Sequence, residues 1–169
     1  MNWDKAYALQ ARSDLDAREH LATSNRLPEC HKLHYVQMAC EKLCKAYLAK
    51  RGSTPETLRK SHAYISKVLP TIVQQTLSRE AGRFSKNTWI VSSIAKLARQ
   101  IELLAPSVDD AGGVPANCEY PWVSQTGEIT VPAQHNFGLT LLHEKAGMTL
   151  LKVLRSTIDE LLSSDETND

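Results

Sequence analysis

The spacing of apolar residues constrains the fold of this chain more than any other feature of the sequence. Within residues 29–51 they recur at steps of three and four: Leu33, Val36, Cys40, Leu43 and Tyr47. Such steps are typical of an α-helix with one buried face. The same spacing occurs in several other segments, and no pair of strands is apparent. The sequence therefore predicts an all-α fold, in which short connections favour an up-and-down antiparallel bundle of four to five helices.

Prolines, glycines and capping residues mark where these helices begin and end. Pro28 suits a first helical turn, and Gly52 follows two cationic residues as a stop signal. Ser85 can cap a further helix, and Pro70 predicts a kink or a break inside the third helix. The predicted helices span residues 3–22, 29–51, 58–82, 86–105 and 136–162.

One long segment, residues 106–138, breaks the helical pattern before the last helix. It holds four of the seven prolines and four of the seven glycines of the chain, and its tetrapeptide EITV is a candidate for a short extended piece. A loop of this length either packs across the bundle or serves a function. We predict one helical domain over residues 1–162, followed by a disordered acidic tail at 163–169.

No stretch of the sequence fits a membrane span or a signal peptide. Apolar runs fall short of the ~20 residues that a spanning helix needs, and the charged start MNWDKAYALQARSD lacks an apolar core. We therefore expect a cytoplasmic protein that does not act at a membrane. Its four cysteines are then expected to be reduced thiols: Cys30, Cys40, Cys44 and Cys118.

The charge of the chain is close to neutral but unevenly distributed. Residues 26–104 carry 14 lysines and arginines against 5 acidic residues, whereas residues 105–135 have no lysine or arginine. Such a basic region can bind phosphate-rich partners, so RNA or nucleotide binding is one interpretation. The other is that two helices have basic solvated faces, since a net charge of +1 falls short of the usual nucleic-acid signature.

Three segments in the first half of the chain match a family pattern. Residues 11–17 are ARSDLDA, residues 37–46 are QMACEKLCKA and residues 61–69 are SHAYISKVL. The series resembles the HEPN family, the higher eukaryote and prokaryote nucleotide-binding domains. The family pattern has a Gln-x-Ala-x-Glu-Lys-x-x-Lys-Ala core, followed by a histidine at the start of the next helix. The resemblance covers residues 5–70.

This resemblance implies a bundle of four or five helices that is usually a homodimer. Many members are metal-independent ribonucleases of toxin–antitoxin or defence systems, some pair with a small nucleotidyltransferase, and others bind nucleotides or act as scaffolds. The ribonuclease members carry an arginine and a histidine separated by four to six residues near the last helices. No arginine stands at that spacing before His135 or His143, so the resemblance leaves open whether this chain is an enzyme.

One arginine and histidine pair at this spacing does occur, at Arg26 and His31 in the segment RLPECH. Such a pair could cleave RNA without a metal, because histidine moves the 2′-hydroxyl proton near neutral pH and arginine stabilises the charge on the phosphorane. The alternative is a surface turn, since Pro28 breaks the helical geometry between the two side chains.

Five residues are candidates for contacting RNA or a nucleotide: Lys42, Lys45, Arg59, His62 and Tyr120. Lysine and arginine neutralise phosphates, aromatic rings stack on bases, and a histidine at a helix start can join backbone N–H groups around an anion. For His62 the alternative is a helix cap beside solvated cations. Trp89 and Trp122 could also stack on bases, and packing in the core or the loop is the alternative for them.

The second helix carries a polar ridge, in which Gln37, Glu41 and Lys45 stand four residues apart. The simplest interpretation is a Glu–Lys pair on the surface, worth about 0.2–0.5 kcal/mol. The ridge could instead form hydrogen bonds to a second copy of the chain or to the long loop, and Lys42 or Lys45 could meet a phosphate. A structural role is the favoured interpretation.

Cysteines and histidines near the start of this helix raise the question of a metal site, which their spacing disfavours. His34 and Cys44 lie about 15 Å apart along a helix that rises ~1.5 Å per residue, too far for one zinc ion. Cys40 lies on the apolar face, where small thiols are often buried. The sequence therefore predicts neither a metal nor another cofactor.

These patterns predict an HEPN-like protein that binds or cleaves RNA or nucleotides, within a prokaryotic toxin–antitoxin or defence system. The expected partners are a second copy of the chain, RNA or a nucleotide, and a nucleotidyltransferase-type or other protein. The alternative is a non-catalytic scaffold or regulator, whose dimer face or long loop engages another protein. Such a scaffold would depend on Tyr120, Trp122 and the polar ridge rather than on any histidine.

Overall fold

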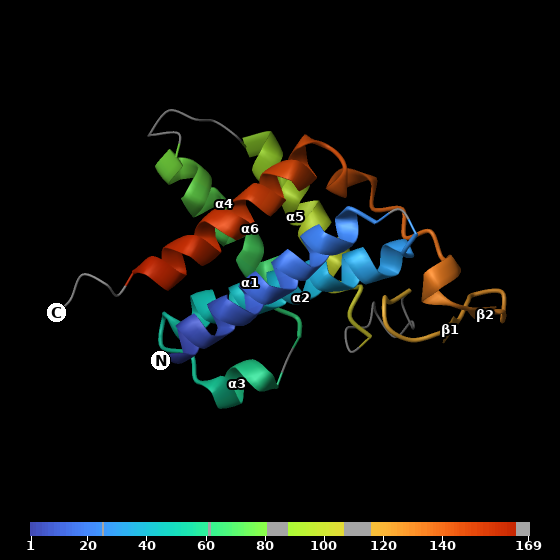
Figure 1. Ribbon diagram of the computed structural model, residues 1–169, viewed down its shortest axis with the longest axis horizontal. Coiled ribbons are helices and arrows are strands. Elements are labelled where there is room, and N and C mark those ends of the chain that lie inside the picture. The colour runs from blue at the N-terminus through green and yellow to red at the C-terminus, as the bar shows by residue number, and fades with distance from the viewer. Residues whose placement is uncertain (25, 61, 81–87, 107–115, 165–169) are drawn as a thin grey trace.

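Helices dominate the computed structural model, which describes residues 1–169 apart from 25, 61, 81–87, 107–115 and 165–169 (Figure 1). They are α1 (Trp3–Ala22), α2 (Glu29–Ala49), α3 (Pro55–Arg59), α4 (Ile65–Glu80), α5 (Thr88–Glu102) and α6 (Lys145–Ser163). The predicted all-α bundle is confirmed. The expected cap Ser85 and most of the expected tail at 163–169 lie outside the described residues.

The central helix of the bundle is α2, which is buried on almost every side. α1 lies antiparallel beside it, and α4, α5 and α6 pack against it as well (Figure 1). The core collects apolar side chains from all five long helices, among them Leu15, Leu43, Leu69, Ile94 and Leu154. Because a helix covered on several sides has no wide solvent face, its polar ridge must lie inside the protein.

The predicted third helix, residues 58–82, consists of two helices with a turn between them. α3 is short, and Thr54 caps it by accepting a hydrogen bond from the Thr57 amide at 3.4 Å. Pro55 occupies its first turn, where a missing N–H costs nothing. The sequence pattern had placed this capped turn outside the helix.

α4 continues through Pro70, so the predicted break lies before Ile65 instead. The start of α4 is held from another helix. Glu102 of α5 accepts hydrogen bonds from the amide and the hydroxyl of Ser66, at 2.9 and 2.7 Å. These bonds satisfy an N–H group at the helix start that has no partner within the helix.

The long loop contains a short β-hairpin, made of β1 (Trp122–Val123) and β2 (Ile129–Thr130). The strands pair antiparallel, with Trp122 opposite Thr130 and Val123 opposite Ile129. Gly127 turns the chain with a φ of 84°, a conformation that favours glycine. The extended piece is confirmed, but the expectation of no paired strands is wrong, because strands of two residues are too short to show alternation.

The last helix, α6, begins at Lys145 and not at residue 136 as predicted. The intervening chain forms the 3₁₀ turns η2 (Pro132–Gln134) and η3 (Thr140–Leu142). Gly138 has a φ of 61°, which an α-helix does not allow. The apolar spacing had continued through this region because Leu139 and Leu142 are also buried, although in non-helical chain.

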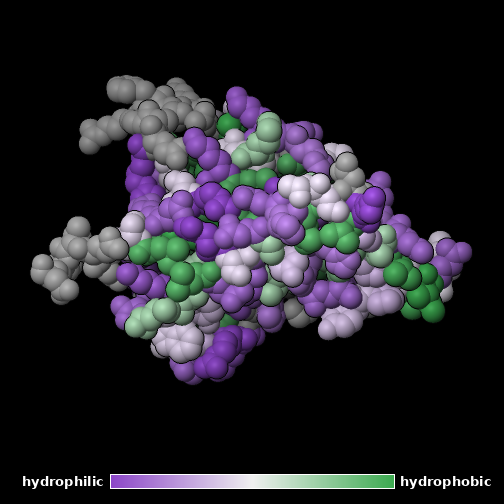
Figure 2. Space-filling model, in the orientation of Figure 1, coloured by the Kyte–Doolittle hydropathy of each residue, from purple (hydrophilic) through white to green (hydrophobic). Residues whose placement is uncertain are grey.

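The visible surface is largely polar, with apolar side chains gathered at the hairpin (Figure 2). Val123, Ile129 and Val131 are all exposed there. None of the described helices is long and apolar enough to cross a membrane.

Candidate functional site

The polar ridge of α2 is the centre of a buried hydrogen-bond network. The Glu41 side chain is 7% exposed, and its carboxylate accepts hydrogen bonds from Gln37 Nε2 at 3.0 Å and from Lys45 Nζ at 2.6 Å. His62 precedes α4 and places Nδ1 3.0 and 3.2 Å from the two carboxylate oxygens. The surface pair expected from the sequence is therefore an interior cluster, which joins α2 to the segment ahead of α4.

Opposing effects determine the charge of Glu41. Burial by itself raises its pKa, but the hydrogen bond and the charge of Lys45, followed by those of His62, outweigh burial and lower the pKa from its ordinary value of 4.5. Glu41 is therefore ionised at neutral pH. The buried ammonium group of Lys45 in turn has its counter-charge within hydrogen-bond distance.

His62 is the member of this network that reaches solvent, with a side chain that is 47% exposed. An ionised carboxylate only accepts hydrogen bonds, so a neutral His62 carries its proton on Nδ1 and presents the lone pair of Nε2. The carboxylate of Glu41 also stabilises the imidazolium that forms when Nε2 takes a proton. General bases in enzymes are oriented by a carboxylate in this way.

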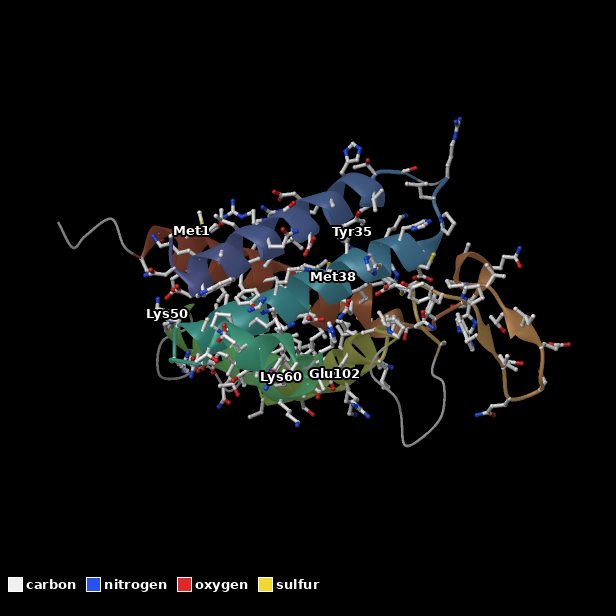
Figure 3. The ribbon with its side chains drawn as sticks, turned by 90° about the horizontal axis from the view of Figure 1, so that it is seen from below. Met1, Tyr35, Met38, Lys50, Lys60 and Glu102 are labelled. Carbon is white, nitrogen blue, oxygen red and sulfur yellow. The ribbon has the colours of Figure 1, made fainter. Side chains whose placement is uncertain are left out.

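The lysines and arginines near His62 divide into one buried and two exposed side chains. Lys45 is held inside the network, where it cannot meet a phosphate in solution. Arg59, at the end of α3, is exposed, and its guanidinium lies 3.6 Å from the exposed Glu56. Figure 3 shows the neighbouring Lys60 at the lower face of the bundle, beside α3. Of the cations named here, Arg59 and Lys60 are the ones accessible to a ligand.

Lys42 lies on the side of α2 that faces α1. Its Nζ is 2.9 Å from Oδ2 of the buried Asp14, and Gln10 donates to the other oxygen of that carboxylate at 3.2 Å. The ammonium group thus forms an ion pair between two helices. A phosphate contact at Lys42 stays a prediction, and it would have to compete with Asp14.

Arg26 and His31 lie around the turn that joins α1 to α2. Both side chains are exposed, and Pro28 is the N-terminal cap of α2 between them. No hydrogen bond or ion pair connects these two side chains within the described part of the chain. The structure therefore does not bring the predicted catalytic pair together.

The aromatic residues singled out in the sequence divide into packed and exposed rings. Trp122 is buried and meets the His135 ring edge to face, with centroids 4.9 Å apart. Loop packing, the alternative predicted for Trp122, is what the structure has. Tyr120 is 61% exposed. Trp89, in the first turn of α5, is exposed as well, and Lys145 Nζ lies 5.6 Å from the centre of its ring.

The cysteines of α2 lie in the apolar core. Cys40 and Cys44 have no exposed surface, and burial raises the pKa of Cys40 to about 12 and that of Cys44 well above its ordinary value. Within the described ranges, no group of three histidine, cysteine, aspartate or glutamate side chains is placed to hold a metal ion. Both thiols are protonated at neutral pH and unsuited to nucleophilic chemistry.

No known protein family, curated protein or solved structure matches this chain. The resemblance to the HEPN family therefore stays a prediction. The network around Glu41 and His62 is the feature that a sequence pattern could show only in part. The ridge was visible, but its link to a histidine 21 positions away depends on how α2 and the start of α4 pack.

Proposed function

We propose that this chain is an HEPN-like protein that acts on RNA, with His62 as the group that transfers a proton at the phosphate. The observation that supports the proposal is the pairing of a half-exposed imidazole with a buried, ionised carboxylate. Nδ1 of His62 lies 3.0 and 3.2 Å from the oxygens of Glu41. Arg59 and Lys60 precede His62 and supply exposed positive charge for a phosphodiester.

This arrangement has the groups that metal-independent cleavage of RNA requires. Nε2 of His62 accepts the proton of a ribose 2′-hydroxyl, whose oxygen attacks the adjacent phosphorus and displaces the 5′-oxygen of the next nucleotide. Glu41 stabilises the resulting imidazolium, and water supplies the proton that the leaving oxygen takes. Arg59 or Lys60 offsets the charge that develops on the phosphorane.

A cleavage assay in the presence of EDTA tests this proposal. Purified protein is mixed with total RNA and with tRNA, and His62→Ala is expected to lower the cleavage rate by about 10²–10⁴-fold. His31→Ala is the matched control, because His31 is also an exposed histidine and lies outside the network. Circular dichroism and melting curves show whether both variants remain folded.

Each outcome of this assay has a distinct meaning. Loss of cleavage in His31→Ala, but not in His62→Ala, would move the site to Arg26 and His31. RNA binding without cleavage, weakened by Arg59→Ala, would restrict the proposal to a binding function. A folded wild-type protein that neither cleaves nor binds RNA would overturn it.

The family resemblance extends the proposal to a homodimer that works in a prokaryotic toxin–antitoxin or defence system. Its partner there would be a nucleotidyltransferase-type or other protein. Light scattering on the purified protein measures the oligomeric state. A monomer at all concentrations would remove the dimer from the proposal and leave the His62 site untouched.

A non-catalytic scaffold is the second candidate, and the hairpin favours it. Opposite residues of paired strands share a face and alternate residues do not, so Val123, Ile129 and Val131 share the outer face. Ile129 is 77% exposed. Exposed apolar patches mark surfaces for protein partners. A scaffold would tolerate His62→Ala and lose its partner with Ile129→Asp, the reverse of what the first candidate requires.

A further inference from the structure

A groove of 630 Å³ lies between the end of α2, the second half of α4 and the C-terminal half of α6. Its described lining includes Tyr47, Arg51, Gln74, Gln75 and Arg79, and none of the residues assigned above to the chemistry at His62. Sites for small ligands commonly have volumes of ~300–1,000 Å³. The groove is therefore large enough for a ligand of the size of one nucleotide.

On the α2 side of this groove, an arginine stacks on a tyrosine. The guanidinium carbon of Arg51 lies 3.5 Å from the centre of the Tyr47 ring. The Tyr47 hydroxyl donates a hydrogen bond to Gln75 Oε1 at 3.1 Å, which orients the ring. No carboxylate of the described residues pairs with Arg51. Stacking holds one face of the guanidinium and leaves its N–H donors for a ligand.

The other charged groups leave the groove with positive charge in excess. Lys50 donates a hydrogen bond to the neutral hydroxyl of Ser164 at 3.2 Å. Arg79 pairs with Glu160, the one carboxylate among the described lining residues. Together with Arg51, these residues amount to three cations against one anion. Figure 3 shows Lys50 at the end of the molecule where Met1 lies, far from Tyr35 at the other end of α2.

We propose that this groove is a second ligand site and binds a nucleoside phosphate. The phosphate lies against Arg51 and Lys50, because a guanidinium donates two parallel hydrogen bonds to phosphate oxygens. The amides of Gln74 and Gln75 offer donors and acceptors to the edge of a base. The ligand is either a free nucleotide or the terminal nucleotide of an RNA. This inference goes beyond the chemistry proposed at His62 and does not depend on it.

Isothermal titration calorimetry on the full-length protein tests the site. The probes are AMP, ATP and GTP as free nucleotides, and a 5′-phosphorylated oligoribonucleotide as an RNA end. At least one probe is expected to bind, and Arg51→Ala is expected to weaken it by about 10- to 100-fold. Arg59→Ala is the matched control, because Arg59 is equally an exposed arginine but does not line the groove. His62→Ala is expected to bind as the wild type does.

The outcomes separate the two sources of the ligand and the two proposals. Binding of a free nucleotide identifies that source, and binding of the oligoribonucleotide alone identifies an RNA end. The proposal is overturned if no probe binds, or if Arg51→Ala and Arg59→Ala weaken binding equally, which would indicate general surface charge. Arg51→Lys keeps the charge but loses the planar fork, so an intermediate loss is expected if Arg51→Ala does not fold. Lost cleavage in His62→Ala with intact nucleotide binding shows that the sites are separate.

Discussion

At the scale of single residues, Glu41 provides a hydrogen-bond acceptor for three polar side chains. Gln37, Lys45 and His62 all bond to its carboxylate. Removing one partner of a buried ion pair leaves an uncompensated charge, which destabilises a protein more than the intact pair stabilises it. The residue that orients the proposed proton-transfer group is therefore also one on which the fold depends.

Glu41→Gln is expected to lower the free energy of unfolding by about 3 kcal/mol at neutral pH, because the buried Lys45 loses its counter-charge. This loss should shrink as the pH falls below 4.5. The pKa of Glu41 is lowered in the folded protein, so its contribution is present above the unfolded pKa and disappears as the pH drops through the folded one. Urea denaturation of both proteins over this pH range measures the difference.

Asp16→Asn is the matched control for this prediction. Asp16 accepts a hydrogen bond from Arg155 at 2.8 Å, but the carboxylate is 55% exposed. An exposed pair contributes about 0.2–1 kcal/mol, so the control should lose little. Equal losses in the two variants would contradict the prediction. A difference between wild type and Glu41→Gln that stays constant with pH would do so as well.

At the scale of elements, the junction between η3 and α6 depends on a glycine inside a helix. A Cβ at Gly147 would lie 2.1 Å from the Leu142 carbonyl oxygen and 2.4 Å from its carbonyl carbon. Elsewhere in a helix, Gly→Ala stabilises by up to ~1 kcal/mol. Here we expect Gly147→Ala to destabilise the protein by about 1–3 kcal/mol, because backbone must move. Urea denaturation measures the sign and the size of the change.

Met148→Ala provides the comparison, since Met148 is the next residue of the same helix and is exposed. Its free energy of unfolding should stay within about 0.5 kcal/mol of wild type. If Gly147→Ala proved more stable than wild type, η3 would not press on α6 as the structure shows.

At the scale of the whole molecule, the central position of α2 controls access to its thiols. Cys40 and Cys44 have no exposed surface, and burial raises the pKa of both. Cys30 lies in the first turn of α2, and Cys118 lies in the loop that follows α5. Helix ends and loops open locally at lower free energy than the core.

An alkylating reagent is therefore expected to modify Cys30 and Cys118 first. Cys40 and Cys44 should react together, at least about tenfold more slowly, because only global unfolding exposes them. Mass spectrometry of peptides over a time course measures the four rates. Low urea concentrations should accelerate the two slow reactions in parallel with unfolding. Early modification of either slow thiol would contradict the central position of α2.

The sequence by itself determined the fold class and the helices whose signals are local. α1 spans the predicted residues 3–22, and α2 begins at the predicted residue 29. Both predictions rested on apolar spacing and on Pro28, which act within a few residues. The polar ridge of α2 was visible for the same reason, because residues four apart share one face of a helix.

Only the tertiary structure decided where polar groups are buried and which of them meet. The sequence could not show that other helices cover the ridge of α2, nor that Glu41 meets His62 across 21 positions. Conversely, it grouped Arg26 with His31 by spacing alone, and the folded chain does not connect them. Spacing reports which side chains share a local face, whereas burial, charge pairing and the shape of a site depend on packing between distant segments.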